Sequence, residues 1–304
     1  MNPVHLETLL AIVDEGSFEY AATVLGITPS AVSQRIKALE ASTGRVLLRR
    51  ANPVTATDAG EILVQSARRM ALVQAETDAR LGQRLQRVPL SVAVNNDTLA
   101  TWFKSVMKEM AQYGEAALRL RVEDETRTLS MLRRGDVLGA ITHEEAPVSG
   151  CVSEYLGTMR YVAVSTPEIK SRFTTEMGLV WRQMPLVIYG PQDAILDQAM
   201  RDRSVELHVI RGRVSQIPTS EAYLEAVRIG LGWGVLAEIQ VQQYLDSGEL
   251  VALDGEDIEV DLYWQRWRLE SEVLEKLTSA VVSAARIALP QKKSPDKKSS
   301  ESAE

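Results

Sequence analysis

The first part of the chain alternates short apolar repeats with residues that start and stop helices. Apolar side chains recur three and four residues apart between Leu6 and Val13, and Gly16 ends that segment. Ser17 and Gly26 bound a second predicted helix, because serine caps helix N-termini and glycine is common just past a helix end. The pattern predicts two short helices before residue 27.

A third helix is predicted after a short turn. Thr28 is an N-cap residue and Pro29 suits the first helical position, so the pattern predicts a helix to about Ser42, stopped by Gly44. The segment 45–57 contains a Pro53 turn between short apolar stretches, which favours a small hairpin. The second and third helices, joined at residues 26–28, form a candidate helix-turn-helix.

The third helix is predicted to have one buried and one exposed face. At about 100° per residue, one stripe collects the apolar side chains Val32, Ile36 and Leu39. The opposite side collects the polar side chains Ser30, Gln34 and Lys37, with Ser33 beside them. Hydroxyl, amide and ammonium groups read base edges in the major groove of DNA, and glutamine pairs with adenine. The exposed face therefore fits a DNA-reading helix.

Local charge favours the same interpretation. Between residues 33 and 50 the cations Arg35, Lys37, Arg45, Arg49 and Arg50 stand against a single anion, Glu40. Cations of this kind bind DNA phosphates. Spacing and charge alone also fit an ordinary helical hairpin with a polar face, so both interpretations stay open at this point.

Residues 58–87 lack proline and carry a repeat of threes and fours. Its members are Leu63, Ala67, Met70, Gln74, Thr77 and Leu81. The repeat predicts a long helix with a weak seam for pairing with a second copy of itself. Two seam positions are polar, which leaves open an amphipathic helix that lies on its own domain.

After Pro89 short apolar runs alternate with helical stretches, which is typical of α/β units with largely parallel strands. The runs are Leu90–Val94, Leu118–Val122, Gly139–Thr142, Tyr161–Val164 and Leu186–Tyr189. About two hundred residues of this pattern suit two lobes better than one sheet. Residues 291–304 are polar and lysine-rich and are predicted to be disordered.

Composition narrows the class of protein. The chain of 304 residues is 45% hydrophobic and 25% charged, as in soluble globular proteins. Its longest apolar-plus-glycine run, residues 229–237, is too short to span a membrane, and no signal peptide is expected. One cysteine and three scattered histidines give no disulfide, metal or cofactor pattern and suit a reducing cytoplasm. The net charge of −7 argues against indiscriminate nucleic-acid binding but allows a small basic reading head.

Residues 16–60 carry a more specific pattern. The run GSFEYAATVLGITPSAVSQRIKALEASTGRVLLRR, followed by Thr55, Thr57 and Ala59-Gly60, resembles the N-terminal signature of LysR-type transcriptional regulators. Three further stretches resemble the lysine- and arginine-responsive ArgP/LysG branch of that family: VNNDTLATW at 94–102, VEDETRTLSMLRRGDVLGAIT at 122–142 and LYWQRWRLES at 262–271. The resemblance covers the chain to about Leu289.

The resemblance implies an α/β fold in three parts. These are an N-terminal winged helix-turn-helix at 1–58, a long dimerising linker helix at 59–88, and a two-lobed effector domain like periplasmic binding proteins at 89–290. Lobe 1 is expected at about 89–161 and 267–290, lobe 2 at about 162–266, and a disordered tail at 291–304. The resemblance also implies a homodimer or homotetramer on a partly symmetric promoter site, with RNA polymerase as a partner.

The family pattern, carried onto this chain, implies a set of DNA-contacting side chains. They are Ser17, Thr28, Ser30, Ser33, Gln34, Arg35, Lys37, Arg49, Arg50 and Thr55. The helical-face argument supports Ser30, Gln34 and Lys37 best. Arg35 lies beside the buried stripe and is expected to reach a phosphate rather than a base.

The effector is expected between the lobes, near the carboxyl ends of strands. The strand at 90–94 runs into a polar turn and a predicted helix that carry Asn96, Asp97, Thr98 and Trp102. Unpaired N–H groups at a helix start favour an anion such as an amino acid carboxylate. The other expected members of the site are Thr142, Thr219, Ser220 and Glu221.

Three consecutive carboxylates, Glu123, Asp124 and Glu125, end the strand at 118–122. Their mutual repulsion makes a nearby cation favourable, and a lysine or arginine effector would supply one. Charge alone leaves this ligand contact and pairing with an arginine of the following helix equally open. The resemblance favours ligand contact.

The residues that carry an enzyme's chemistry are not evident in the sequence. No catalytic motif is present, and the GxGxG run at 230–234 lacks the spacing of a nucleotide-binding loop. We therefore expect a cytoplasmic, non-enzymatic regulator that binds promoter DNA, senses lysine, arginine or histidine, and activates an amino-acid exporter gene. The alternatives are a LysR-type regulator of a non-basic small molecule and a cytoplasmic amino-acid-binding protein without promoter activity.

Overall fold

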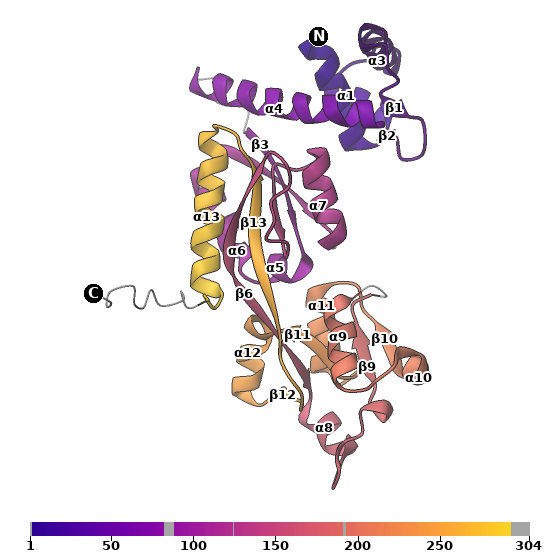
Figure 1. Cartoon of the computed structure of the whole chain (residues 1–304), viewed down its shortest axis with the longest axis vertical. Coiled ribbons are helices and arrows are strands. Elements are labelled where there is room, and N and C mark those ends of the chain that lie inside the picture. Colours follow the sequence, from indigo (N-terminus) through magenta and orange to yellow (C-terminus); the bar gives the residue numbers. More distant parts are fainter. Residues whose placement is uncertain (1, 82–87, 124, 191–192, 293–304) are drawn as a thin grey trace, which may run out of the picture. The chain divides into compact units, whose positions relative to one another are not determined.

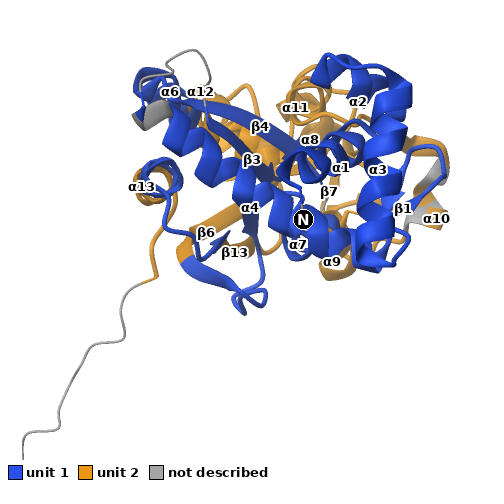
Figure 2. Cartoon of the chain, turned by 90° about the horizontal axis from the view of Figure 1, so that it is seen from above, with its two compact units in different colours: residues 1–95, 105–154, 264–281 blue, residues 96–104, 155–263, 282–304 orange. Residues whose placement is uncertain are grey.

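The structure is a computed structural model that describes residues 2–81, 88–123, 125–190 and 193–292 (Figure 1). The chain divides into two compact units, which Figure 2 colours separately. Unit 1 comprises residues 1–95, 105–154 and 264–281, and unit 2 comprises residues 96–104, 155–263 and 282–304. The chain therefore passes from one unit to the other several times.

Three helices and a hairpin form the N-terminal head of unit 1. The helices are α1 (Pro3–Glu15), α2 (Phe18–Leu25) and α3 (Pro29–Thr43), and β1 (Leu48–Arg49) pairs with β2 (Thr55–Ala56). Side-chain oxygens of Asn2, Ser17 and Thr28 cap the helix starts, and left-handed glycines end the helices at positions 16, 26 and 44. The predicted helices, turn and hairpin are confirmed, because these local signals set their limits.

The long helix α4 (Asp58–Arg80) differs between its two halves. Leu63, Val64 and Ala67 pack in the apolar cluster of the head. Further along the predicted seam the side chains are exposed: Met70, Gln74, Thr77 and Leu81, which directly follows the helix. Packing on its own domain thus accounts for two of the six seam positions, Leu63 and Ala67, and pairing through the other four stays a prediction. Residues 82–87 of the expected linker lie outside the described residues.

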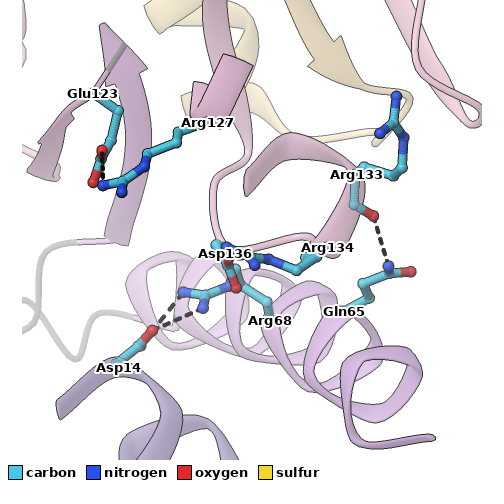
Figure 3. Close-up of polar contacts among 8 residues, drawn as sticks. All are labelled: Asp14, Gln65, Arg68, Glu123, Arg127, Arg133, Arg134 and Asp136. Carbon is cyan, nitrogen blue, oxygen red and sulfur yellow. Dashed lines mark hydrogen bonds and ion pairs between the residues drawn. The ribbon is translucent and has the colours of Figure 1, made fainter. Parts of the chain in front are cut away.

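Two polar contacts fasten the first half of α4 within unit 1 (Figure 3). Arg68 Nη2 lies 2.7 Å from Asp14 Oδ1 on α1, and the two side chains are only 9% and 12% exposed. Gln65 Nε2 donates to the carbonyl oxygen of Arg133 at 2.8 Å. Helix α4 is therefore tied both to the head and to the end of α7 (Glu125–Arg134).

The second half of α4 contacts the C-terminal part of unit 1. The Arg69 guanidinium lies 4.3 Å from the centroid of the Trp267 ring, a cation–π geometry. Glu76 Oε1 accepts hydrogen bonds from the Ser271 hydroxyl and, at 3.4 Å, from the Val273 amide. The carboxylate thus caps the start of α13 (Glu272–Ala288), where free N–H groups favour a negative charge.

The sheet of unit 1 is built on a parallel core. Strand β3 (Val88–Val94) pairs in parallel with β4 (Ala116–Val122) and β5 (Gly139–Thr142), and the amide of Trp267 on β13 (Ile258–Trp267) donates to Leu138. Helix α6 (Phe103–Tyr113) precedes β4, and α7 packs on β3 and β5. A Cβ on Gly139 would lie 2.2 Å from the Trp264 ring, so this close approach requires glycine.

Unit 2 combines antiparallel and parallel pairs. Strand β6 (Cys151–Ser165) pairs antiparallel with β11 (Gly234–Ala237) and β12 (Val251–Ala252), whereas β9 (Leu186–Ile188) and β10 (Val214–Gln216) are parallel. A small hairpin joins β7 (Thr174–Thr175) and β8 (Gly178–Leu179). The helices are α5 (Asn96–Ala100), α8 (Pro167–Phe173), α9 (Ala194–Asp202), α10 (Leu207–Ile210), α11 (Ser220–Arg228) and α12 (Glu238–Ser247), with 3₁₀ turns η1 (Trp181–Gln183) and η2 (Arg211–Arg213).

The predicted strands and the expected α/β class are confirmed. The five apolar runs lie in β3, β4, β5, β6 and β9. The expected lobe limits at 161/162 and 266/267 lie beyond 154/155 and 263/264, where the chain passes between the units, and residues 96–104 and 282–290, expected in lobe 1, belong to unit 2. Of the expected tail, Gln291 donates to the Leu156 carbonyl at 2.9 Å, and residues 293–304 lie outside the described residues. No helix in the described ranges has the length and apolar character needed to cross a membrane.

The buried ion pair of α4 gives a test of how the head is held. Asp14→Ala is expected to lower the free energy of unfolding by about 3–5 kcal/mol, because it removes the closest carboxylate from a guanidinium that stays buried. Urea unfolding followed by circular dichroism measures this loss. The matched double variant Asp14→Leu with Arg68→Met removes both charges and should lose less. A single variant as stable as the wild type would show that the pair does not hold the head.

Candidate functional site

Helix α3 turns its polar side chains away from its buried stripe. The stripe consists of Val32, Ile36 and Leu39, each at most 2% exposed. On the other face Ser30, Gln34 and Lys37 are exposed, and Ser33 is half-buried. A helix that packs on one face and presents amide, hydroxyl and ammonium groups on the other has the form needed to enter a major groove.

Arg35 lies beside the buried stripe. Its Nη1 donates to the hydroxyl of Thr8 on α1 at 3.3 Å, and Thr8 is buried. The guanidinium is thus directed toward α1 rather than along the exposed face. Its expected contact with a DNA phosphate stays a prediction.

Ser17 and Thr28 have structural partners. Ser17 Oγ accepts from the amides of Glu19 and Tyr20 at 3.2 and 3.4 Å, and Thr28 Oγ1 accepts from the Ala31 amide at 3.2 Å. Both hydroxyls therefore cap the helices of the helix-turn-helix. Contact with DNA from these positions stays a prediction.

The β1–β2 hairpin carries exposed cations. Arg49 forms an ion pair with Asp58 at 3.1 Å, but the two side chains are 62% and 97% exposed, so the pair is weak. The Arg50 guanidinium lies 5.9 Å from the centroid of the Phe18 ring, and Thr55 is exposed. These groups are accessible to a phosphate backbone.

Glu40 is the single acidic residue between positions 33 and 50, against five cations. Glu40 Oε1 accepts a hydrogen bond from the Leu47 amide at 2.8 Å, which directs one carboxylate oxygen to the backbone before β1. The head thus combines a polar reading helix with a local excess of positive charge.

In unit 2 a polar cluster forms around Asp97, in the first turn of α5. The Tyr161 hydroxyl on β6 donates to Asp97 Oδ2 at 3.1 Å, and the Ser220 hydroxyl at the start of α11 donates to Asp97 Oδ1 at 3.0 Å. Gln240 on α12 donates from Nε2 to the Ser220 hydroxyl oxygen at 3.3 Å. We call Asp97, Tyr161, Ser220 and Gln240 the Asp97 cluster. It unites two predicted site residues, Asp97 and Ser220, with two that the sequence did not indicate.

Further acidic groups surround the Asp97 cluster. Burial raises the pKa of Asp193 above its ordinary value, and the negative charge of Asp97 raises it further. Burial also raises the pKa of Tyr189, whose hydroxyl interacts with the side chain of Asn96 and is in the field of Asp97 and Glu221. A carboxylate that raises the pKa of a neighbouring acidic group contributes to a negative potential, and this potential favours a bound cation.

The other predicted residues near α5 and α11 have different environments. Thr98 and Trp102 are buried, and the indole N–H of Trp102 has no hydrogen-bond acceptor among the described residues. Thr219 is the N-cap residue of α11, but its side chain makes no capping hydrogen bond. A buried indole N–H without an acceptor is costly, which makes Trp102 a candidate donor to a ligand.

The acidic triplet and Thr142 belong to unit 1. Glu123 Oε2 lies 3.4 Å from Arg127 Nη1, an exposed ion pair between residues four apart along the chain (Figure 3). Asp124 lies outside the described residues, and of Glu125 only the backbone, at the start of α7, is described. Thr142 is buried, and its hydroxyl accepts from the Glu144 amide at 3.2 Å.

Glu123 thus adopts the arginine pairing that charge alone left open. An exposed pair of this kind contributes little stability, so the ligand contact expected for the triplet stays a prediction. No group of three or more His, Cys, Asp or Glu side chains within the described ranges is arranged to hold a metal ion.

Sequence reasoning missed Tyr161, Tyr189, Asp193 and Gln240. Tyr161 and Ser220 are 64 and 123 residues away from Asp97 along the chain, so no local pattern joins them. Only Asp193 has a local signal, because its carboxylate caps α9 by accepting from the Leu196 amide at 2.9 Å.

Comparison with known proteins agrees with both parts of the chain. Residues 3–61 match the family described as bacterial regulatory helix-turn-helix protein, lysR family, and residues 83–286 match the LysR substrate binding domain. The lysine export transcriptional regulatory protein LysG of Corynebacterium efficiens is 55% identical over 289 residues, 95% of this chain and 99% of that protein.

Two solved structures are similar over nearly the whole chain. Full-length LysG from Corynebacterium glutamicum with bound effector Arg matches with a TM-score of 0.76 and 52% identity, covering 95% of this chain and 100% of that one. ArgP from Mycobacterium tuberculosis matches with a TM-score of 0.78 and 35% identity, covering 94% of this chain and 98% of that one. The chain with the reading head of unit 1 and the polar cluster of unit 2 therefore belongs to the LysR family of bacterial regulatory helix-turn-helix proteins.

Proposed function

We propose that this protein is a transcriptional regulator that senses a basic amino acid in unit 2 and activates an amino-acid exporter gene. The observation that carries the proposal is the carboxylate-rich surrounding of the Asp97 cluster. Lysine, arginine and histidine carry a side-chain cation that such a surrounding stabilises. The similarity to a LysG whose structure contains bound arginine supports the same class of effector.

The amino acid's two ends need different partners. The carboxylates of Asp97 and Asp193 suit an ammonium or guanidinium group. The Trp102 N–H and the start of α11, whose N-cap Thr219 makes no side-chain capping bond, suit the α-carboxylate. Glu123, Asp124, Glu125 and Thr142 remain proposed members of the site on the strength of the family resemblance.

The head carries the proposed DNA-binding surface, which is the exposed face of α3 together with the cations of the β1–β2 hairpin. A homodimer or homotetramer would present two copies of α3 to successive major grooves, about 34 Å apart. The exposed second half of the α4 seam supports pairing of two chains. We also propose contact with RNA polymerase at the promoter, a cytoplasmic location and the absence of catalytic activity, as the resemblance to LysR-type regulators implies.

Regulation requires only that the effector bind one arrangement of the units better than another. Because the chain passes between the units several times, the segments that form the Asp97 cluster continue directly into unit 1. Within unit 1, helix α4 connects the head to the rest of the unit through Asp14–Arg68 and Glu76–Ser271.

Calorimetric titration with lysine, arginine, histidine, leucine and benzoate tests the proposed effector class. Saturable binding is expected for the basic amino acids only, because leucine and benzoate lack the cationic side chain. Binding confined to benzoate or leucine would retain the regulator and discard the basic effector. The variant Glu123→Ala tests the triplet in the same assay, and an unchanged lysine affinity would remove Glu123 from the site.

Lysine affinity is expected to rise as the pH is raised through the range in which the Asp193 carboxyl, whose pKa lies above its ordinary value, loses its proton. The pKa of Asp193 is raised in the free protein, so at acid pH a proton competes with the lysine cation. Calorimetry in buffers of different ionisation enthalpy should record proton release on binding at the acid end. Affinity that is constant over this range would contradict the role of Asp193.

The reading role of α3 is tested with Gln34→Ala. Loss of an amide that contacts a base is expected to weaken binding to the operator by about 1–3 kcal/mol with little change on random DNA. Fluorescence anisotropy at fixed salt measures both affinities, and Arg50→Ala, which removes an exposed cation of the hairpin rather than a side chain of α3, serves as the matched variant that should weaken them alike. Equal losses of Gln34→Ala on both DNAs would contradict base reading.

A further inference from the structure

The carboxylate of Asp97 is held by hydroxyl groups from two separate elements of unit 2. Tyr161 on β6 donates to one oxygen and Ser220 on α11 donates to the other, at 3.1 and 3.0 Å. Tyr161 is 3% exposed and Ser220 is 1% exposed, so neither donor is free to turn toward water. Two donors on different oxygens fix the plane of the carboxylate, and because both are neutral they leave its negative charge in place.

Gln240 contacts Ser220 through both ends of its side-chain amide. Its Nε2 lies 3.4 Å from the Ser220 carbonyl oxygen and 3.3 Å from the Ser220 hydroxyl oxygen. A carbonyl oxygen only accepts, so the amide end that faces it must be the NH₂ group. Gln240 Oε1 also lies 3.4 Å from the Ser220 hydroxyl oxygen, but Asp97 Oδ1 is nearer, at 3.0 Å, and is the stronger acceptor when ionised. With the Gln240 NH₂ group donating to the hydroxyl oxygen, the single hydroxyl hydrogen therefore points to Asp97. The order of donation is therefore Gln240 to Ser220 to Asp97.

Several acidic groups act electrostatically in the neighbourhood of Asp97. Asp193 at the start of α9 and Glu221 on α11 are carboxylates, and Tyr161 and Tyr189 are phenols. Each of them becomes more negative, never positive, as the pH rises. A carboxylate in such a field favours the binding of a cation and disfavours the binding of an anion.

We propose that Tyr161 and Gln240 are positioning residues of the effector site, which hold the Asp97 carboxylate in the orientation that receives the cationic group of a basic amino acid. Tyr161 acts directly and Gln240 acts through Ser220. The proposal rests on the proposed function, because it assumes that the effector carries a cation. It adds that specificity depends on the direction of two hydroxyl hydrogens as well as on the acidic charge.

The variant Gln240→Glu separates orientation from charge. Glutamate has the size of glutamine, but its carboxylate accepts where the amide donates, so it draws the Ser220 hydrogen away from Asp97. A site governed by charge alone would bind lysine more tightly with one more carboxylate nearby. A site governed by orientation binds lysine more weakly, by about tenfold, since one charge-assisted hydrogen bond is lost.

The variant Tyr161→Phe tests the direct donor and has a pH signature. Removal of the hydroxyl takes a hydrogen bond from the ionised carboxylate, so the pKa of Asp97 rises and the acid limb of lysine binding moves to higher pH. A loss that came only from disturbed packing would lower the affinity by the same factor at every pH. Tyr155→Phe is the matched control, because its hydroxyl lies on the same strand and bonds Thr158 instead.

The experiment is calorimetric titration of the full-length protein and these variants with lysine across the pH range, with thermal unfolding and operator binding recorded for each. The expected result is a loss of lysine affinity of about tenfold in Gln240→Glu and Tyr161→Phe, a shifted acid limb in Tyr161→Phe, and no change in Tyr155→Phe. Three results would overturn the inference while the proposed function stands. They are wild-type affinity in both variants, tighter lysine binding by Gln240→Glu, and a loss of affinity in Tyr161→Phe without a shift of the acid limb. A wild type that binds no basic amino acid would overturn the proposed function and the inference with it. If one variant fails to fold, the other still decides the outcome.

Discussion

The nearly buried ion pair between Asp14 and Arg68 joins the head to the helix on which the rest of unit 1 depends. Removing two charges from water is costly, so such a pair persists only where its geometry is fixed, and this fixes α4 against α1. The same helix contacts α7 through Gln65 and the start of α13 through Glu76. One helix thus contacts the head, the end of α7 and the start of α13, all within unit 1.

The chain separates two binding chemistries of opposite sign. Residues 33–50 of the head carry five arginine and lysine side chains against one carboxylate, Glu40, which accepts a hydrogen bond from the backbone. The Asp97 cluster is surrounded by carboxylates and phenols. A net charge of −7 is therefore compatible with DNA binding, because the acidic residues that dominate the total lie away from the reading helix along the chain.

Side-chain hydrogen bonds hold the residues of the Asp97 cluster together. Four elements, α5, β6, α11 and α12, each supply one side chain, and the three shortest contacts lie between 3.0 and 3.3 Å. A site assembled in this way responds to small displacements of any one element, because hydrogen bonds weaken steeply with distance and angle. This sensitivity is a property that a ligand-dependent switch requires.

The sequence by itself determined the elements whose signals are local. Caps at Ser17 and Thr28, glycines past the helix ends and the angular spacing of Val32, Ile36 and Leu39 predicted the helix-turn-helix and its exposed face, since capping and helical periodicity depend on neighbours within a few residues. The apolar runs predicted the strands for the same reason. Tertiary structure alone decided that Tyr161 and Gln240 join the cluster around Asp97, that Glu123 pairs with Arg127, and that α4 packs Leu63 and Ala67 of its seam against the head. These contacts link residues by the path of the folded chain, or select between partners that charge makes equivalent, and no local pattern in the sequence encodes that choice.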